Sequence, residues 1–393
     1  MLGWLTRDEV LAELGVRPQT LYAYVSRGIV LSRADPEDPR RSLYRKADID
    51  QLRSKRERGK RVASIAASTM AWGEPIITTE ISTIVGGRLY YRGHDAVALA
   101  EGASLEDTAQ ILWACPSRPR FVAAGSAAAR GPDRRTEVFT ILAETAARSA
   151  PTTDRPAAVL FNEADAVVGE IARAMGAYGS PQAGGRRHAA DPAPLHERLA
   201  KGWGLRPSEA GLLRRALVLR ADQELNTSTF ATRVAASTGA GLGPCLLAGL
   251  SALSGPLHGD ASDQIAALMD EAARSTIGRT VARYVEADRS LPGFGHPLYP
   301  DGDPRAEALI AAFPVPPAFE DARQAVGAAT GQKPNLDFAV VALAAHLGLP
   351  ADAPFCLFVM ARAVGWVAHA LEQAAHHALM RPRARYEGPA VVV

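Results

Sequence analysis

Residues 291–305 read Leu-Pro-Gly-Phe-Gly-His-Pro-Leu-Tyr-Pro-Asp-Gly-Asp-Pro-Arg, and this stretch guides the interpretation of the chain. Seven of its fifteen residues are glycine or proline. Glycine permits positive φ and lets a ligand approach the backbone, whereas proline fixes φ and removes a hydrogen-bond donor. The stretch therefore predicts a shaped loop that presents one histidine, His296. A plain turn whose histidine packs or faces water is the alternative for this loop taken alone.

Two other loops each carry one polar residue suited to catalysis. Residues 254–260 read Ser-Gly-Pro-Leu-His-Gly-Asp and hold His258 just after an apolar run. Residues 334–338 read Pro-Asn-Leu-Asp-Phe and hold Asp337 just before another apolar run. An aspartate can take a proton from a CH group beside a carbonyl, one histidine can hydrogen-bond the enolate oxygen, and a second can protonate the electrophile. The three loops thus favour carbon–carbon bond formation, which requires no metal.

Four further motifs complete an ordered set. They read Leu-Tyr-Tyr-Arg-Gly-His at 89–94, Ala-Asp-Gln-Glu-Leu-Asn-Thr-Ser-Thr-Phe at 221–230, Ala-Arg-Ala-Val-Gly-Trp-Val-Ala-His at 361–369 and Arg-Pro-Arg-Ala-Arg-Tyr at 381–386. Together with the three loops, they make residues 70–393 resemble citrate synthase. The resemblance implies an all-α fold with a large helical domain and a smaller one, roughly residues 260–350, that closes over the substrates. Closure would exclude water from a short-lived thioester enolate.

The same resemblance implies a role for each polar residue. His258 would donate a hydrogen bond to the thioester oxygen of acetyl-CoA, Asp337 would remove a methyl proton, and His296 would act as the acid at the oxaloacetate carbonyl. A guanidinium can hold a carboxylate through two charged hydrogen bonds. The residues implied in oxaloacetate binding are Gln223, Arg305, Arg362 and Arg381, and those implied in CoA binding are Leu291, Pro292, Gly293, Phe294 and Gly295.

The implied reaction is that of citrate (Si)-synthase in the tricarboxylic acid cycle. Such an acyltransferase condenses acetyl-CoA with oxaloacetate and releases citrate and CoA. Acetyl-CoA is then a co-substrate, and neither a further cofactor nor a metal is expected. The resemblance also implies that Arg381 reaches into the site of a partner subunit, so a homodimer is expected.

Two departures from the family pattern leave the substrates open. Gln223 stands where the family usually has a histidine, and it can hydrogen-bond but cannot be charged. Asp260 replaces the second glycine of the usual His-Gly-Gly. Synthesis of 2-methylcitrate from propionyl-CoA is therefore the near alternative.

Residues 1–62 form a separate, basic unit in this interpretation. They hold 14 Lys or Arg and 9 Asp or Glu, although the net charge of the whole chain is only +2. Thr6-Arg-Asp-Glu9 predicts a capping box at the start of a helix that Gly15 ends. A second helix is expected from Pro18 to Gly28, followed by a basic wing over 32–44 and a third helix over 47–54. The order resembles the winged helix-turn-helix domain of MerR-type regulators.

This resemblance implies that the first unit binds DNA. The second helix would enter the major groove and the wing would contact phosphates, with Gln19, Thr20, Tyr22, Arg40 and Arg41 as the candidate contacts. A docking module with a solvated basic tail is the alternative. A regulator whose synthase-like body senses acyl-CoA or a 2-oxo acid is a further alternative for the whole chain. A short linker is expected at 63–69.

Composition agrees with a folded cytoplasmic protein. The chain of 393 residues is 47% hydrophobic and 22% charged, and its three cysteines, Cys115, Cys245 and Cys356, are far apart. Neither an export signal nor a membrane span is expected. Alanine- and leucine-rich segments predict helices over 104–113, 135–148, 156–175, 207–218, 222–238 and 262–273.

Overall fold

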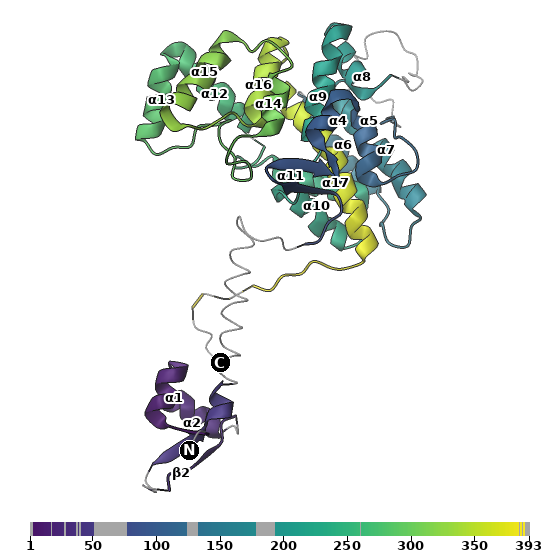
Figure 1. Cartoon of the computed structure of the whole chain (residues 1–393). Coiled ribbons are helices and arrows are strands. Elements are labelled where there is room, and N and C mark those ends of the chain that lie inside the picture. Colours follow the sequence, from purple (N-terminus) through teal and green to yellow (C-terminus); the bar gives the residue numbers. More distant parts are fainter. Residues whose placement is uncertain are drawn as a thin grey trace. The chain divides into compact units, whose positions relative to one another are not determined.

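The computed structural model divides the chain after Thr78 into two compact units, here called the head (Met1–Thr78) and the body (Thr79–Val393). It describes residues 3–16, 18–26, 29–36, 38, 41–50, 77–123, 133–177, 193–259, 261–384, 386 and 388–389. The predicted linker at 63–69 lies outside these ranges. Figure 1 shows the helical body and the smaller head.

The head contains two short helices and a three-stranded antiparallel sheet. Its elements follow in the order β1 (Trp4–Thr6), α1 (Arg7–Leu14), α2 (Pro18–Ser26), β2 (Ser32–Ala34) and β3 (Ser42–Arg45), and the strand order is β1-β3-β2. Residues 46–50 are helical, and the rest of the predicted third helix lies outside the described residues. A small core joins these elements through Val10, Leu14, Leu21, Val30, Tyr44 and Ile49.

Local sequence sets the ends of α1. The Thr6 side chain accepts a hydrogen bond from the backbone N–H of Glu9, and the Glu9 carboxylate accepts one from the backbone N–H of Thr6, which completes the predicted capping box. Gly15 has a φ of 57° and ends the helix, as predicted. The predicted end of α2 at Gly28 lies outside the described residues.

The body is built mainly from helices packed around one long helix, α17 (Ala353–His376), which is buried along most of its length. This helix is long and apolar enough to cross a membrane, but 94% of its most apolar stretch is buried inside the protein. It is therefore explained as a core helix. The helices before it are α4 (Ala96–Gly102), α5 (Leu105–Trp113), α6 (Arg134–Arg148), α7 (Ala157–Ala174), α8 (Leu195–Gly202), α9 (Ala210–Arg220), α10 (Thr227–Ser237) and α11 (Leu242–Leu253).

Five helices form a second group within the body. They are α12 (Ala261–Arg274), α13 (Ile277–Glu286), α14 (Pro304–Ile310), α15 (Pro317–Thr330) and α16 (Leu336–His346), and they pack mainly on one another. Figure 1 shows this group beside the larger one, and α14 and α16 lie against α9 at the junction. The group occupies the range in which the smaller domain is predicted.

The expectation of an all-α fold is too narrow, because the described residues include strands in both units. In the body, β4 (Ser82–Val85) pairs with β5 (Arg88–Tyr91), which pairs with β6 (His94–Asp95). Gly86 and Gly87 have φ values of 57° and 71° and form the two-residue turn between β4 and β5. Such a turn requires positive φ at both positions, which glycine adopts without strain.

The segment before α10 is not helical, in contrast to the prediction. One helix was predicted over 222–238, but α10 begins only at Thr227. Glu224 has a φ of 52°, and the Asn226 side chain caps the helix by accepting from the backbone N–H of Thr229 at 3.1 Å. Gln223 consequently lies in a loop.

That loop lies directly against α17. A Cβ atom added to Gly365 would stand 2.4 Å from Oδ1 of Asp222 and 2.5 Å from the carbonyl oxygen of Ala221. Only glycine lets the two segments approach so closely. The contact fixes α17 beside the loop that carries Gln223.

Candidate active site

The loop that carries His296 is held against the start of α16. The backbone N–H of Gly295 donates to the carbonyl of Lys333 at 2.9 Å, and that of Asn335 donates to the carbonyl of Gly293 at 2.8 Å. The Asn335 side chain caps α16 by accepting from the backbone N–H of Asp337 at 3.0 Å. These bonds bring Asp337 to the loop of His296.

Burial controls the charge of His258. Burial, followed by the positive charge of Arg362, lowers the pKa of His258 to about 4, and the charge of Asp337 only partly opposes this shift. His258 is therefore a neutral ring at neutral pH. Its Nε2 lies 2.8 Å from Oγ of Ser228, which also accepts from Nε1 of Trp366 at 3.2 Å.

His296 is held in one tautomer. Its Nδ1 accepts the backbone N–H of Leu298 at 3.1 Å, so the hydrogen of the neutral ring lies on Nε2. That Nε2–H faces the side-chain amide of Gln223, whose nitrogen is 2.9 Å away. Since two donors cannot bond to each other, the amide oxygen of Gln223 must turn to His296 as the acceptor. Burial, followed by Arg305, lowers the pKa of His296, and Asp337 is among the groups that oppose the shift. Asp337 thus lies within electrostatic reach of both predicted histidines.

Arg305 and Arg362 are buried in this region, with exposed fractions of 2% and 1%. The Asp303 carboxylate accepts from Nε and Nη2 of Arg305, both at 2.9 Å. Burial alone would lower the pKa of Arg305, but Asp303 raises it above its usual value. Burial lowers the pKa of Arg362 to about 10, which still leaves its side chain charged at neutral pH.

A third buried arginine, Arg220, belongs to the same region and was not predicted. It ends α9, and its Nη1 lies 2.7 Å from Oδ1 of Asp337. In a sequence, a basic residue in the last turn of a helix is ordinary, because it complements the helix dipole. Its place beside Asp337 follows only from tertiary folding.

The other predicted residues are placed less uniformly. Arg381 is exposed in the segment after α17. It takes no part in the ion pairs described above for Arg220 and Arg305. In the CoA-binding stretch, Leu291, Gly293 and Phe294 are buried, and the Phe294 ring lies 4.8 Å from that of Phe338. Pro292 and Gly295 are half-buried. This stretch therefore offers a ligand mainly its backbone.

The DNA-binding candidates lie in the head. Gln19 and Tyr22 are exposed on α2, Tyr22 with 52% of its surface accessible, and Thr20 is half-buried. Arg41 is exposed beside Asp38, with 3.3 Å between Nε and Oδ2. Arg40 lies outside the described residues, and so does Asp260 of the body.

A buried chain of polar groups supports the loop of Gln223. Asp222 accepts from Oγ of Ser82 and from Nε2 of His369, the latter at 3.3 Å. Nδ1 of His369 lies 3.2 Å from Nη1 of Arg233, which also donates to Glu372 at 2.5 Å. Because a guanidinium only donates, His369 must accept at Nδ1 and donate at Nε2. The chain therefore fixes the orientation of Asp222.

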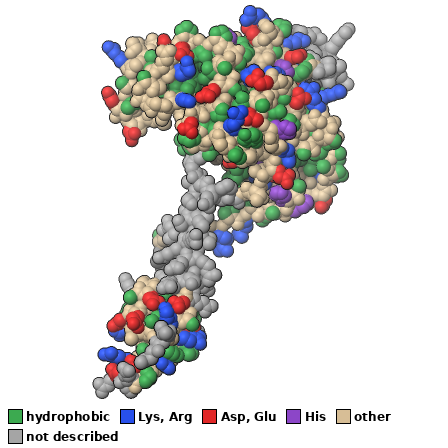
Figure 2. All heavy atoms as spheres, viewed as in Figure 1, with side chains coloured by type: hydrophobic (Ala, Val, Ile, Leu, Met, Phe, Trp, Pro, Cys, Tyr) green, Lys and Arg blue, Asp and Glu red, His purple; other side chains and the backbone are tan. Residues whose placement is uncertain are grey.

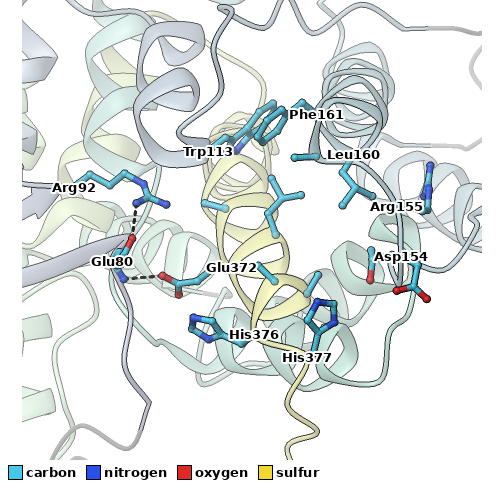
Figure 3. Close-up of a pocket in the computed structure, with 16 residues that line it drawn as sticks. Glu80, Arg92, Trp113, Asp154, Arg155, Leu160, Phe161, Glu372, His376 and His377 are labelled. Carbon is cyan, nitrogen blue, oxygen red and sulfur yellow. Dashed lines mark hydrogen bonds and ion pairs between the residues drawn. The ribbon is translucent and has the colours of Figure 1, made fainter.

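The far end of this chain borders a cavity of about 440 Å³. Figure 3 shows Trp113 and Phe161 at one end of the cavity and His376 and His377 at the other. The side chain of Glu372 lines it and accepts from the backbone N–H of Glu80 at 2.7 Å. None of the predicted site residues that the structure describes lines this cavity, so the candidate active site is defined by its ion pairs and hydrogen bonds.

The described part of the chain contains no metal-ligand cluster. There, no group of three or more His, Cys, Asp or Glu side chains is arranged to hold a metal ion. The polar groups around Asp337 are instead those of acid–base chemistry and carboxylate binding.

Known proteins of one family match most of the chain. The model of the family described as "Citrate synthase, C-terminal domain" matches residues 70–383. The citrate synthase of Haloferax volcanii is 30% identical over 362 residues, which cover 80% of this chain and 94% of that protein. The crystal structure of citrate synthase from Thermotoga maritima MSB8 matches with a TM-score of 0.68 at 26% identity, covering 82% of this chain and 96% of that one.

Other relatives align over shorter regions. Citrate synthase 2 of Bacillus subtilis (strain 168) is 34% identical over 47% of this chain, and 2-methylcitrate synthase 1 of Corynebacterium glutamicum is 33% identical over 44%. The chain spans about half the length of these two proteins, 52% and 49% respectively. The fold is that of citrate synthases, as the solved structure from Thermotoga maritima MSB8 shows. The chain belongs to the citrate synthase family.

We expect Asp303→Asn to destabilise the protein by about 3–5 kcal/mol at pH 7, because it leaves the buried Arg305 cation without an anion. Burial would raise the pKa of Asp303, but Arg305 lowers it below the usual 3.8. The stabilising contribution of this carboxylate is therefore complete above about pH 5 and is lost as pH falls through its folded pKa.

Urea denaturation followed by circular dichroism between pH 7 and pH 3 measures this effect. The difference between wild type and Asp303→Asn should shrink toward the acid end. Asp301→Asn is the matched control, since Asp301 is exposed on the same loop. A difference that stays constant with pH would contradict this role of the Asp303 charge.

Proposed function

We propose that the chain condenses acetyl-CoA with oxaloacetate to give citrate and CoA through an enolate. The observation that carries this proposal is the set of buried cations around Asp337. Nε of Arg220, Nη1 of Arg305 and Nη1 of Arg362 are buried and have no hydrogen-bond partner among the described residues. Unpaired charged donors are costly in a protein interior, so a site of this kind is suited to an anionic substrate.

Enolate formation falls to Asp337 and His258. The carboxylate of Asp337 removes a proton from the methyl group, and the electron pair of the broken C–H bond forms the carbon–carbon double bond of the enolate. His258 donates a hydrogen bond to the thioester oxygen, where negative charge develops. The neutral ring of His258 suits this role, because it donates a hydrogen bond to the thioester oxygen and keeps its own proton.

The role of His258 also requires a defined tautomer. For Nδ1 to carry the ring hydrogen, Ser228 must donate its hydroxyl hydrogen to Nε2. Oγ of Ser228 donates its one hydrogen to Oδ1 of Asn226 at 2.9 Å, and Nε2 of His258 lies 2.8 Å from the same oxygen. Donation from Trp366 Nε1 to the same oxygen holds the hydroxyl in place. Ser228 is therefore assigned as the partner of His258, and the Nδ1–H tautomer forms when the hydroxyl hydrogen points to Nε2 of His258 and not to Asn226.

His296 acts on the second substrate. Its Nε2–H can donate to the oxaloacetate carbonyl while the enolate carbon attacks, and the new alkoxide then takes that proton from Nε2. Water next cleaves the thioester and releases CoA. Arg305 and Arg362 hold the two carboxylates of oxaloacetate, and Arg381 is assigned to the site of a partner subunit in a homodimer.

We expect Asp337→Ala and His258→Ala each to lower kcat by about 10²–10⁴-fold, the usual effect of removing a base or an oxyanion donor. The assay is CoA release from acetyl-CoA with oxaloacetate, and circular dichroism checks folding. His376→Ala, which changes an exposed histidine at the end of α17, is the control. Wild-type turnover by either folded site variant would refute the assignment.

Gln223 is assigned to substrate selection, since its amide faces His296. A histidine at this position can offer a charged hydrogen bond where glutamine offers a neutral one, a difference of about 1 kcal/mol. Gln223→His should therefore lower the KM for oxaloacetate several-fold with little change in kcat. If the pocket suits another 2-oxo acid, the variant loses activity with that acid and gains nothing with oxaloacetate.

Steady-state kinetics with a panel of 2-oxo acids distinguish these outcomes. The same panel, repeated with propionyl-CoA, tests the alternative of 2-methylcitrate synthesis. An unchanged KM with every acid would mean that residue 223 does not act on the substrate.

We further propose that the head binds DNA as a winged helix-turn-helix domain. The supporting observation is the sequence of elements, in which α1 and α2 follow each other closely and precede the antiparallel pair β2 and β3. Gln19 and Tyr22 are exposed on α2, where they can meet base edges, and Arg41 is exposed beside β3. In a homodimer, two heads would bind paired half-sites, and the body could then act as a sensor of acyl-CoA or a 2-oxo acid.

Gel-shift assays with duplex fragments of the host genome test this second proposal. The affinity should fall steeply with salt, and Arg40→Ala with Arg41→Ala should weaken binding and reduce the salt dependence, because phosphate contacts are ionic. Turnover should not change. Arg279→Ala, an exposed arginine of α13, is the control. Absence of any shift at low salt would overturn DNA binding.

A further inference from the structure

Arg220 forms an ion pair with the proposed catalytic base. Only 4% of Arg220 is exposed, its Nη1 lies 2.7 Å from Oδ1 of Asp337, and its guanidinium lies 4.4 Å from the centre of the Phe358 ring. Such a pair occupies one of the two carboxylate oxygens of Asp337. While the pair lasts, Asp337 is a poor acceptor for the proton of a methyl group.

A substrate carboxylate could replace Asp337 as the partner of Arg220. Nε of Arg220 is buried and has no hydrogen-bond partner among the described residues, so the side chain can bind a second anion. Arg362 is adjacent, since its Nε donates to the backbone carbonyl of Arg220 at 3.3 Å. Both guanidiniums lie over the Phe358 ring, Arg362 at 5.0 Å from the ring centre. A carboxylate bound to Arg362 therefore arrives beside Arg220.

We propose that Arg220 is a positioning residue that exchanges Asp337 for a carboxylate of the 2-oxo acid and thereby frees the base only when that substrate is bound. The inference rests on the proposed condensation. In the freed state, Oδ1 of Asp337 takes the methyl proton, the C–H electron pair forms the double bond, and the thioester oxygen takes the negative charge.

Exchange of the acetyl-CoA methyl protons in D₂O tests the inference without the condensation step. The loss of the methyl signal is followed by NMR, with and without malate. Malate is the chosen probe because it is a dicarboxylate of the same length as oxaloacetate and has no carbonyl for the enolate to attack. In the wild type, malate should accelerate exchange at least tenfold.

Arg220→Gln should remove this dependence. The variant should exchange equally fast with and without malate, and its KM for oxaloacetate should rise about tenfold or more, because a charged hydrogen bond is lost. Arg215→Gln is the matched control on α9, since Arg215 pairs with Glu101 through two contacts of 2.7 Å. That control should keep the malate dependence of the wild type.

Two results would overturn the inference. One is full malate dependence in Arg220→Gln, and the other is malate-independent exchange in the wild type. If circular dichroism shows that Arg220→Gln does not fold, Arg220→Lys replaces it as the test variant. Lysine keeps the charge but cannot form the two parallel hydrogen bonds of a guanidinium. It should raise exchange without malate at least threefold, and an unchanged rate would overturn the inference.

Citrate formation by the wild type is measured in parallel. A wild type that forms no citrate contradicts the proposed function itself. A wild type that forms citrate, combined with an Arg220→Gln variant that behaves like Arg215→Gln, contradicts only the role of Arg220.

Discussion

The carboxylate of Asp303 is the constraint on which the geometry of the site depends. It accepts the backbone N–H and the side chain of Arg305, and it also accepts the backbone N–H of Leu336, at 3.1 Å, from the first turn of α16. One buried anion thus ties the buried Arg305 to the helix that carries Asp337. Because the desolvation of charge is costly, this arrangement is stable only if every hydrogen bond is made. The relative positions of Arg305 and Asp337 follow from that requirement.

The sequence predicted the parts of the site that local chemistry determines. Glycines and prolines marked the loop of His296, and both glycines in its Gly-Phe-Gly segment do have positive φ, 84° at Gly293 and 68° at Gly295. The capping box of α1 and the glycine that ends this helix also depend only on neighbouring residues, and both predictions are confirmed. The hairpin of β4 and β5 was missed, although Gly86-Gly87 between β-prone residues was an available turn signal.

Other parts could not be predicted, because they depend on tertiary contacts. Arg220 reads as an ordinary basic end of a helix, and Asp303 reads as an ordinary helix cap. Ser228 reads as one of several hydroxyl residues in the first turn of α10. Each is distinguished only by its neighbour in the folded protein. Arg220 contacts Asp337, Asp303 contacts Arg305, and Ser228 contacts His258. The assignment of Gln19, Thr20, Tyr22, Arg40 and Arg41 to DNA binding stays a prediction.

The surface carries charges of both signs. Figure 2 shows acidic and basic side chains interspersed on the visible face of the described residues, in keeping with a net charge of +2.

The site is divided between the two helix groups of the body. Arg220 and Gln223 belong to the larger group, whereas Asp337 and His296 belong to the group of α12–α16. The two polar contacts that join them, Arg220 with Asp337 and Gln223 with His296, therefore cross the boundary between the groups. Neither group holds all of the residues to which we assign the reaction, so each can keep its helices while the proposed site is incomplete. Mild denaturant that separates the groups should consequently abolish turnover at concentrations where the helical ellipticity is still that of the native protein.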